Sequence, residues 1–219
     1  FGTLAVLGIF FAVSAQLADI GFGSSLTRSE RVDDADLSTI FYYNIGMSSL
    51  LYLILFIAAP WIADYFRNPI LVSVLRVTSL SIVINSLCSI QGILVWRQMQ
   101  FRKDMLIQLA SGVLSGLTGV AMAYFGFGYW ALVGMGLANS IVRLIGYWCS
   151  SSWRPKLIFS VEKLKLHFGY GSRMVGAGLI TTLYNNLMTI LIGRYFSLST
   201  LGLYGNANGL YIVPVSVIA

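Results

Sequence analysis

Charged residues are scarce in this sequence. They make up 10% of its 219 residues, whereas hydrophobic residues make up 57%. A soluble domain carries about 25% charged residues, so this chain cannot cover a water-facing surface in the usual way. Apolar segments of about 20 residues, enough to cross the hydrocarbon core of a bilayer, recur along the chain. The sequence therefore predicts an all-α integral membrane protein, a multi-span helical bundle, and excludes an ordinary soluble domain.

Side chains typical of catalytic and metal sites are also few. His167 is the single histidine, and the two cysteines, Cys88 and Cys149, have no metal-ligand spacing. The sequence holds no paired-carboxylate motif, no Ser/His/Asp or Cys/His set and no phosphate-binding loop. We therefore expect no enzyme activity, no cofactor and no metal. Both cysteines lie in apolar runs and are expected to pack as small hydrophobic residues.

Seven membrane spans can be drawn on the apolar segments. Acidic residues at 33–36 and the pair Asn68-Pro69 mark the starts of the second and third, because both patterns suit the first turn of a helix. The chain begins without methionine and ends inside an apolar run, so we expect a piece of a longer protein. The predicted spans are 2–26, 38–63, 68–96, 104–125, 129–149, 166–192 and a last one from 199.

Basic residues predict the orientation of these spans. One set of connections holds Arg28, Arg31, Arg97, Arg102, Lys103, Arg154, Lys156, Lys163 and Lys165. The other set holds only Arg67 and Arg194. By the positive-inside rule, loops 27–37, 97–103 and 150–165 are cytoplasmic. Because these loops account for the basic excess, no nucleic-acid partner is expected.

Small residues crowd the fourth and fifth predicted spans. The stretch "GVLSG", from Gly112 to Gly116, has small residues four positions apart, a spacing that lets two helices approach closely. We expect Gly116 to lie in such a contact, so that Gly116→Leu disrupts packing.

Several polar side chains fall inside the predicted spans, where lipid-facing helices do not need them. Polar groups at such depth commonly face a bundle interior or a water-filled cavity and mark a substrate path. The candidates for substrate binding are Arg143, Arg76, Arg173, Asn85, Asn139, Asn185 and Asn186, and Gln91 is a further polar residue at depth.

The three arginines carry the strongest of these signals. No glutamate lies at comparable depth, and guanidinium groups bind phosphate oxygens in a two-pronged manner, so an anionic substrate is expected. Arg143 lies about 21 Å along its helix from Tyr129. At that depth it is also within reach of the cytoplasmic headgroups, so an anchoring role stays open beside the binding role. Asp19, in "LADIGFGSS", is a candidate for cation coupling or for capping the nearby turn.

Short stretches along nearly the whole chain resemble one family. They are "FGTLAV", "LADIGFGSSL", "NPILVSVLRVTSL", "LVWRQMQFRK", "GFGYWALV", "WRPKL" and "LIGRYFSLSTLGLYGNA". Together they are similar to bacterial polysaccharide-biosynthesis flippases of the Wzx type, close to the colanic-acid exporters. That family lies in the superfamily of multidrug, oligosaccharidyl-lipid and polysaccharide exporters, whose helices form two lobes around a central cavity.

The resemblance implies a division of the chain. Residues 1–150 would be five spans of the N-terminal lobe, lacking its first helix, and residues 151–165 the cytoplasmic loop between lobes. Residues 166–219 would open the C-terminal lobe. "FGTLA" at Phe1 recurs loosely as "LGLYG" at Leu201, as a repeat of six spans would require.

The resemblance also implies a function. Such a protein flips an undecaprenyl-pyrophosphate-linked oligosaccharide across the bacterial plasma membrane for exopolysaccharide or O-antigen synthesis. Its partners would be that lipid-linked substrate, membrane lipids, and a polysaccharide polymerase with its export machinery. Related sequences often carry an aspartate where this chain has Met188, which weakens cation coupling through that helix.

Two other functions stay open on the sequence. A cation-coupled drug antiporter shares the architecture but needs buried carboxylates facing a cavity, and Asp19 is the single candidate. A membrane-embedded glycosyl or acyl transferase needs a histidine or acidic site at a membrane face, and this sequence offers none.

Overall fold

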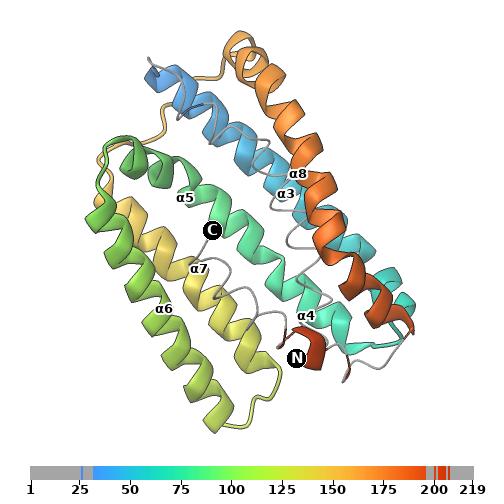
Figure 1. Cartoon of the computed structure of the whole chain (residues 1–219). Coiled ribbons are helices and arrows are strands. Elements are labelled where there is room, and N and C mark those ends of the chain that lie inside the picture. Colours follow the sequence, from blue (N-terminus) through green and yellow to red (C-terminus); the bar gives the residue numbers. More distant parts are fainter. Residues whose placement is uncertain (1–25, 27–31, 196–199, 201, 206, 208–219) are drawn as a thin grey trace.

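The computed structural model describes residues 26, 32–195, 200, 202–205 and 207 (Figure 1). Nearly all of the first and seventh predicted spans, and with them Asp19, lie outside the described residues. The six helices in the described part are α3 (Asp34–Tyr65), α4 (Ile70–Thr78), α5 (Leu80–Arg97), α6 (Phe101–Tyr124), α7 (Trp130–Ser150) and α8 (Val161–Tyr195).

The predicted all-α membrane fold is confirmed. Four helical segments among the described residues are long and apolar enough to cross a membrane: Asp34–Tyr65, Ile70–Arg97, Phe101–Tyr124 and Trp130–Ser150. They correspond to the second through fifth predicted spans, and α8 covers the sixth.

The spanning helices lie side by side and alternate in direction. Figure 1 shows α3, α5, α7 and α6 in that order across the bundle, with α4 continuing into α5. The most extensive packing joins α6 to α7, and α5 packs on both α3 and α7. We call the end where α3, α6 and α8 begin the basic end, because Arg97, Lys156 and Lys163 lie there, and the other the opposite end.

The segment connecting α7 to α8 is shorter than predicted. Residues 161–165 were expected in the cytoplasmic loop, but α8 already begins at Val161, so the connection is residues 151–160. Ser160 explains the early start, because its Oγ accepts the Lys163 N–H at 3.4 Å and its carbonyl accepts the Leu164 N–H at 3.0 Å. The expected loops 27–37 and 97–103 are shorter too, since α3 begins at Asp34 and α6 at Phe101.

The third predicted span consists of two helices. Its start is as predicted, because Asn68 Oδ1 accepts the Ile70 N–H at 3.2 Å just before α4. The helix then breaks at Ser79, which the sequence did not predict. The hydroxyl of Ser79 donates to the Leu75 carbonyl at 2.6 Å and that of Thr78 to the Val74 carbonyl at 2.7 Å. Such bonds compete with the backbone ladder and commonly bend helices.

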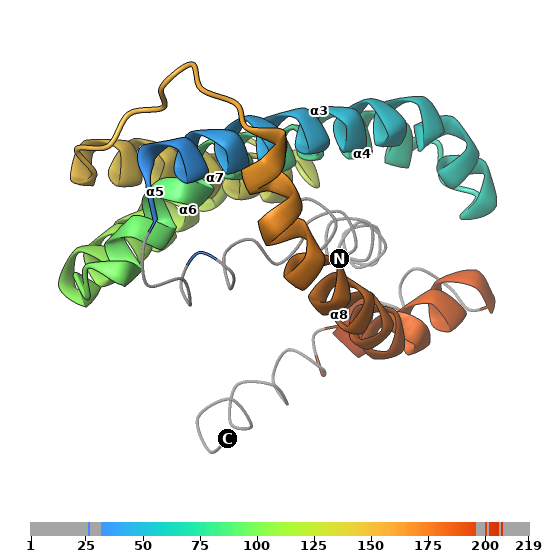
Figure 2. The ribbon, with the colours of Figure 1, turned by 90° about the horizontal axis from the view of Figure 1, so that it is seen from above.

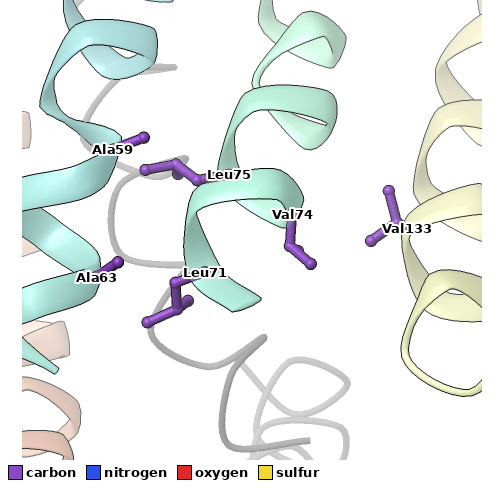
Figure 3. Packing of buried hydrophobic residues seen from close by; sticks show 6 residues of the cluster. All are labelled: Ala59, Ala63, Leu71, Val74, Leu75 and Val133. Carbon is purple, nitrogen blue, oxygen red and sulfur yellow. The ribbon is translucent and has the colours of Figure 1, made fainter. Parts of the chain in front are cut away.

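A compact apolar cluster joins α3, α4 and α7 at the opposite end. In Figure 3 two alanines of α3 face two leucines of α4, while a valine of α4 points toward a valine of α7. Alanine lets neighbouring helices approach closely, so the short helix α4 is held between two long ones. The cluster consists of Ala59, Ala63, Leu71, Val74, Leu75 and Val133.

The structure shows no close contact at Gly116, contrary to the prediction. A Cβ atom added at Gly112 or Gly116 would meet no atom within 4 Å. Gly112 is exposed, and Gly116 lines a pocket between α6 and α7. The close α6–α7 contacts lie elsewhere. A Cβ atom at Gly134 would come 2.2 Å from Met122 Sδ, and one at Gly146 would come 2.9 Å from Ile107 Cγ2. The sequence pattern predicted close helix packing but identified the wrong glycine.

Orientation in the membrane can be tested on two exposed side chains. Leu157, in the connection at the basic end, is 95% exposed, and Phe125, at the opposite end of α6, is 75% exposed. We expect an impermeant thiol reagent added outside intact cells to label Phe125→Cys but not Leu157→Cys, in a background without Cys88 and Cys149. Labelling of Leu157→Cys alone would show that the protein has the opposite orientation in the membrane.

Candidate functional site

Arg143 lies on the face of α7 that packs against α5. It is half-buried and about 10 Å from the end of the helix at Ser150. Its Cζ atom lies 5.9 Å from the ring centroid of Tyr147, one turn nearer the basic end. Its Nε atom is buried and has no hydrogen-bond partner in the described part of the chain. The guanidinium therefore lies against protein and leans toward the basic end.

An aromatic–carboxylate pair adjoins Arg143. The Tyr147 hydroxyl donates to Asp104 Oδ1 at 2.5 Å, which joins α7 to the first turn of α6. Tyr147 thus lies between Arg143 and a carboxylate that the sequence analysis did not connect with this region. The available signal was weak: Tyr147 follows Arg143 by four positions, hence on the same helix face, and Asp104 looked like an ordinary acidic residue at a helix start.

Asn85 and Asn139 lie at the contact between α5 and α7. Asn85 Nδ2 donates to Ser140 Oγ at 3.4 Å, and Asn139 is the half-buried neighbour of Ser140. Ser140 precedes Arg143 by three positions, so it shares that face of α7. The structure therefore brings Arg143, Asn85 and Asn139 into one region.

A second polar contact, between α3 and α5, was not identified from the sequence. Asn44 Nδ2 donates to Ser89 Oγ at 3.3 Å, and Ser48 Oγ donates to Ser86 Oγ at 2.8 Å. Gln91 is fully buried on α5, and neither amide atom has a hydrogen-bond partner among the residues that the structure describes. Serines are too common in membrane helices to reveal such a contact by sequence alone.

Arg76 lies away from Arg143 and has a local partner. Its Nε donates to the Phe56 carbonyl at 3.3 Å, and its Cζ lies 4.3 Å from the centroid of the Phe56 ring. The carbonyl is free because Pro60, four residues later inside α3, has no N–H to donate. An unpaired carbonyl is costly in a bilayer. Arg76 therefore compensates for the proline.

The two arginines belong to different halves of the bundle. Val133 packs in the cluster beside α4, which carries Arg76. Arg143 lies about 15 Å further along α7. The structure therefore does not bring Arg76 and Arg143 into one contact.

Arg76 and Pro60 should be coupled in stability. Arg76→Ala removes the donor to a carbonyl that Pro60 leaves free, so we expect a loss of about 1–3 kcal/mol. In the Pro60→Ala background the backbone amide can satisfy that carbonyl, and Arg76→Ala should cost much less. The measurement is a double-mutant cycle on thermal unfolding in detergent. Equal losses in both backgrounds would contradict the role of Arg76.

The remaining candidates lie on α8. Arg173 and Asn185 fall within the helix, and their side chains lie outside what the structure describes. Asn186 Nδ2 donates to the Thr182 carbonyl at 2.8 Å, a contact within the helix itself. Met188 is exposed.

Metal binding has no support in the described residues. Among them, no three His, Cys, Asp or Glu side chains come together as ligands. Cys88 is buried as expected, whereas Cys149 is exposed, contrary to the expectation that both would pack inside. The polar groups that lie near one another, Arg143, Asn85 and Asn139, can form hydrogen bonds, and Arg143 can bind an anion.

Comparison with known proteins places the chain in a family. The family model described as "polysaccharide biosynthesis protein" matches residues 1–219. The chain belongs to this polysaccharide biosynthesis protein family. The resemblance found in the sequence is thereby confirmed. No solved structure matches the chain.

Several curated proteins are similar to the chain over most of its length. The succinoglycan biosynthesis transport protein ExoT of Rhizobium meliloti is 27% identical over 100% of this chain and 44% of its own length. The lipopolysaccharide biosynthesis protein WzxC of Escherichia coli is 27% identical over 98% of this chain and 44% of its length. The teichuronic acid biosynthesis protein TuaB of Bacillus subtilis is 27% identical over 93% and 43%. The chain thus spans less than half the length of these three relatives.

Proposed function

We propose that the chain forms part of a polysaccharide transporter that flips an undecaprenyl-pyrophosphate-linked oligosaccharide across the bacterial plasma membrane. Family membership and the word "transport" in the name of the relative ExoT support export of a polysaccharide unit. Four apolar spanning helices support a multi-pass membrane location. The lipid-linked form of the substrate and the plasma membrane are the finer parts of the proposal.

Arg143 is the observation that carries the proposal. A charged side chain inside a bilayer costs about 2.5–3.5 kcal/mol or more, so it is retained for a purpose. Its guanidinium is partly buried against Tyr147, and the buried Nε has no partner among the described residues. Guanidinium groups bind phosphate oxygens through two parallel hydrogen bonds. We assign Arg143 the contact with the pyrophosphate, while the lipid tail stays in the bilayer.

The other candidates take supporting roles. Asn85 and Asn139 lie in the same α5–α7 region and would contact the glycan or phosphate oxygens. Arg76 would join only in a state in which it leaves the Phe56 carbonyl. Arg173, Asn185 and Asn186 on α8 would face the substrate from the C-terminal lobe.

The proposal includes an arrangement in two lobes. Helices α3 to α7 would belong to the N-terminal lobe and α8 would open the C-terminal lobe. The divergence of α8 from the other helices supports this division (Figure 2). A polysaccharide polymerase and its export machinery are the expected partners, and the basic end would face the cytoplasm.

One observation favours a second function, a cation-coupled antiporter. Asp104 is a carboxylate that contacts Tyr147 within the bundle, and such pairs suit proton or cation exchange. If this function were correct, Asp104→Asn would abolish transport and Arg143→Gln would not.

The proposed function can be tested in a strain from which the gene has been deleted. A deletion strain should accumulate lipid-linked repeat units that remain inaccessible from outside, and the complete protein should restore surface polysaccharide. Normal surface polysaccharide in the deletion strain, with no related gene to compensate, would contradict the proposal.

A further inference from the structure

The connection between α7 and α8 is bound to the start of α3 through its own backbone. The Lys156 N–H donates to Ser38 Oγ and the Ser160 N–H to Thr39 Oγ1, each at 3.1 Å. Ser38 and Thr39 are both fully buried. Buried hydroxyl groups require hydrogen-bond partners, so these contacts are part of the packing at the basic end.

Ion pairs reinforce the same contact. Lys156 Nζ lies 2.5 Å from Asp34 Oδ2, and Lys163 Nζ lies 3.3 Å from Asp33 Oδ2 and 3.0 Å from Asp36 Oδ2. The hydrogen bonds to Asp36 and Asp33 raise the pKa of Lys163 above its usual value, so the lysine is charged at neutral pH. Lys163 belongs to α8, whereas Asp36 lies in the first turn of α3 and Asp33 is the residue just before it. The pairs therefore join two helices distant in sequence.

Aromatic side chains also join α3 to the connection and to α7. The Phe41 ring lies 5.9 Å from that of Trp153 in the connection and 6.4 Å from that of Trp148 on α7, both edge to face. Arg154 donates to the Trp148 carbonyl at 3.2 Å and lies over its ring. The connection, residues 151–160, is thus ordered by contacts with α3 and α7, and we call it the strap.

Helix α8 packs on the other helices in its first half and diverges in its second half. Leu164, near its start, and Leu179, about halfway along, pack against the cluster around Phe41. In the second half, Tyr184 and Tyr195 are each 78% exposed. Figure 2 shows α8 starting beside α3 and then running away from the layer of the other helices.

We propose that these contacts form a reversible latch between α3 and α8. We define the latch as Asp33, Asp34, Asp36, Ser38 and Thr39 with Lys156, Ser160 and Lys163. It holds the basic ends of the two helices together in one state of the transport cycle and opens in another. The inference rests on the proposed function, because alternating access requires one helical bundle to rock against the other.

The energetics suit a latch that opens. Exposed ion pairs contribute little each, which applies to Lys156–Asp34 and to Lys163–Asp33. Only the Lys163–Asp36 pair is mostly buried, so the three pairs together do not lock the contact permanently. The side chains of Lys156 and Asp34 are 58% and 47% exposed, and their partners can be replaced by water. The aromatic cluster on α3, α7 and the strap can stay packed while α8 moves.

Cross-linking provides the first test. Thr39→Cys with Ser160→Cys, in the complete protein without Cys88 and Cys149, should form a disulfide on oxidation. We expect export to fall at least tenfold in the oxidised protein and to return on reduction, whereas the export of each single cysteine variant should not change between the two conditions. Normal export by fully cross-linked protein would overturn the latch. If this pair does not fold, Asp33→Cys with Lys163→Cys replaces it, because Asp33 is largely exposed.

A distance measurement provides a test that needs no substrate. Spin labels at Tyr65→Cys and Tyr195→Cys report the separation of α3 and α8 at the opposite end, in vesicles. Lys156→Gln with Lys163→Gln should shift the distance distribution, because the latched state loses its ion pairs. Lys165→Gln, an exposed lysine outside the latch, should leave it unchanged. An unchanged distribution in the double variant would overturn the latch.

The two readouts separate this inference from the proposed function. A shifted distance with export that never depends on Arg143 would support the latch and contradict the substrate assignment. Export that depends on Arg143 but tolerates the cross-link would support the function and contradict the latch.

Discussion

Arg143→Gln in the complete protein is expected to abolish polysaccharide export without lowering the amount of protein in the membrane. Glutamine keeps a polar tip but loses the positive charge and the two-pronged donor that matches phosphate oxygens. Hydrogen bonds to charged groups contribute about 1.5–3 kcal/mol each, so losing a pair weakens substrate binding by about 100-fold or more. The measurement is surface polysaccharide, normalised to membrane protein by immunoblot.

The lysine variant separates binding from anchoring. Arg143→Lys keeps the charge without the planar guanidinium, so part of the export should remain if Arg143 binds phosphate. An arginine that only reaches the headgroups would be fully replaceable by lysine, and glutamine would then lower abundance and not export. Arg102→Gln, at an exposed position of the basic end, is the matched control and should export normally. Full export by abundant Arg143→Gln protein would contradict the binding role.

The second large effect concerns folding. Gly146→Leu should sharply reduce the yield of folded protein, because α6 and α7 form the most extensive contact in the described bundle. Even a Cβ atom at Gly146 would lie 2.9 Å from Ile107 Cγ2 and 3.1 Å from Ile107 Cγ1. Isoleucine is stiff at χ1 and cannot move aside easily. Overpacking of this kind costs about 1–3 kcal/mol or more.

Gly116→Leu is the matched control for this substitution. It adds the same side chain to α6, where a Cβ atom would meet nothing within 4 Å and a pocket lies beside it, so the yield should be close to that of the unmodified protein. The yield of the folded Gly146→Ala variant should lie between the yields of the two leucine variants. Fluorescence-detected size-exclusion chromatography in mild detergent measures all three, and equal yields for the two leucine variants would show that the α6–α7 contact is not needed for folding.

The functional region was only partly predictable from sequence. Depth in an apolar segment was sufficient to select Arg143 and Asn85, because a polar group in a bilayer is conspicuous. The partner Asp104 could not be selected, since it lies at a helix start, where acidic residues are common. Arg76 was selected for the same reason as Arg143, yet its described contact is the Phe56 carbonyl freed by Pro60. Contacts between residues on different helices are known only from the tertiary structure.

The strap shows the same limit at the basic end. The sequence predicted residues 151–165 as a cytoplasmic loop, because lysine and arginine are frequent there. It did not predict that Lys156 and Lys163 would pair with the acidic start of α3, more than 100 residues earlier. The charge composition of a loop predicts on which side of the membrane the loop lies. It does not predict which residues the loop contacts.

The membrane environment, the approximate helix boundaries and the family resemblance could all be predicted from the sequence alone. Hydrophobic runs and loop charges are local properties, and transfer into a bilayer acts on each segment separately. The tertiary structure decided which glycines pack, which arginine is occupied locally, and how α8 is held against α3. Those outcomes depend on the rotation of each helix about its axis, which packing between neighbours sets and which composition along one helix does not encode.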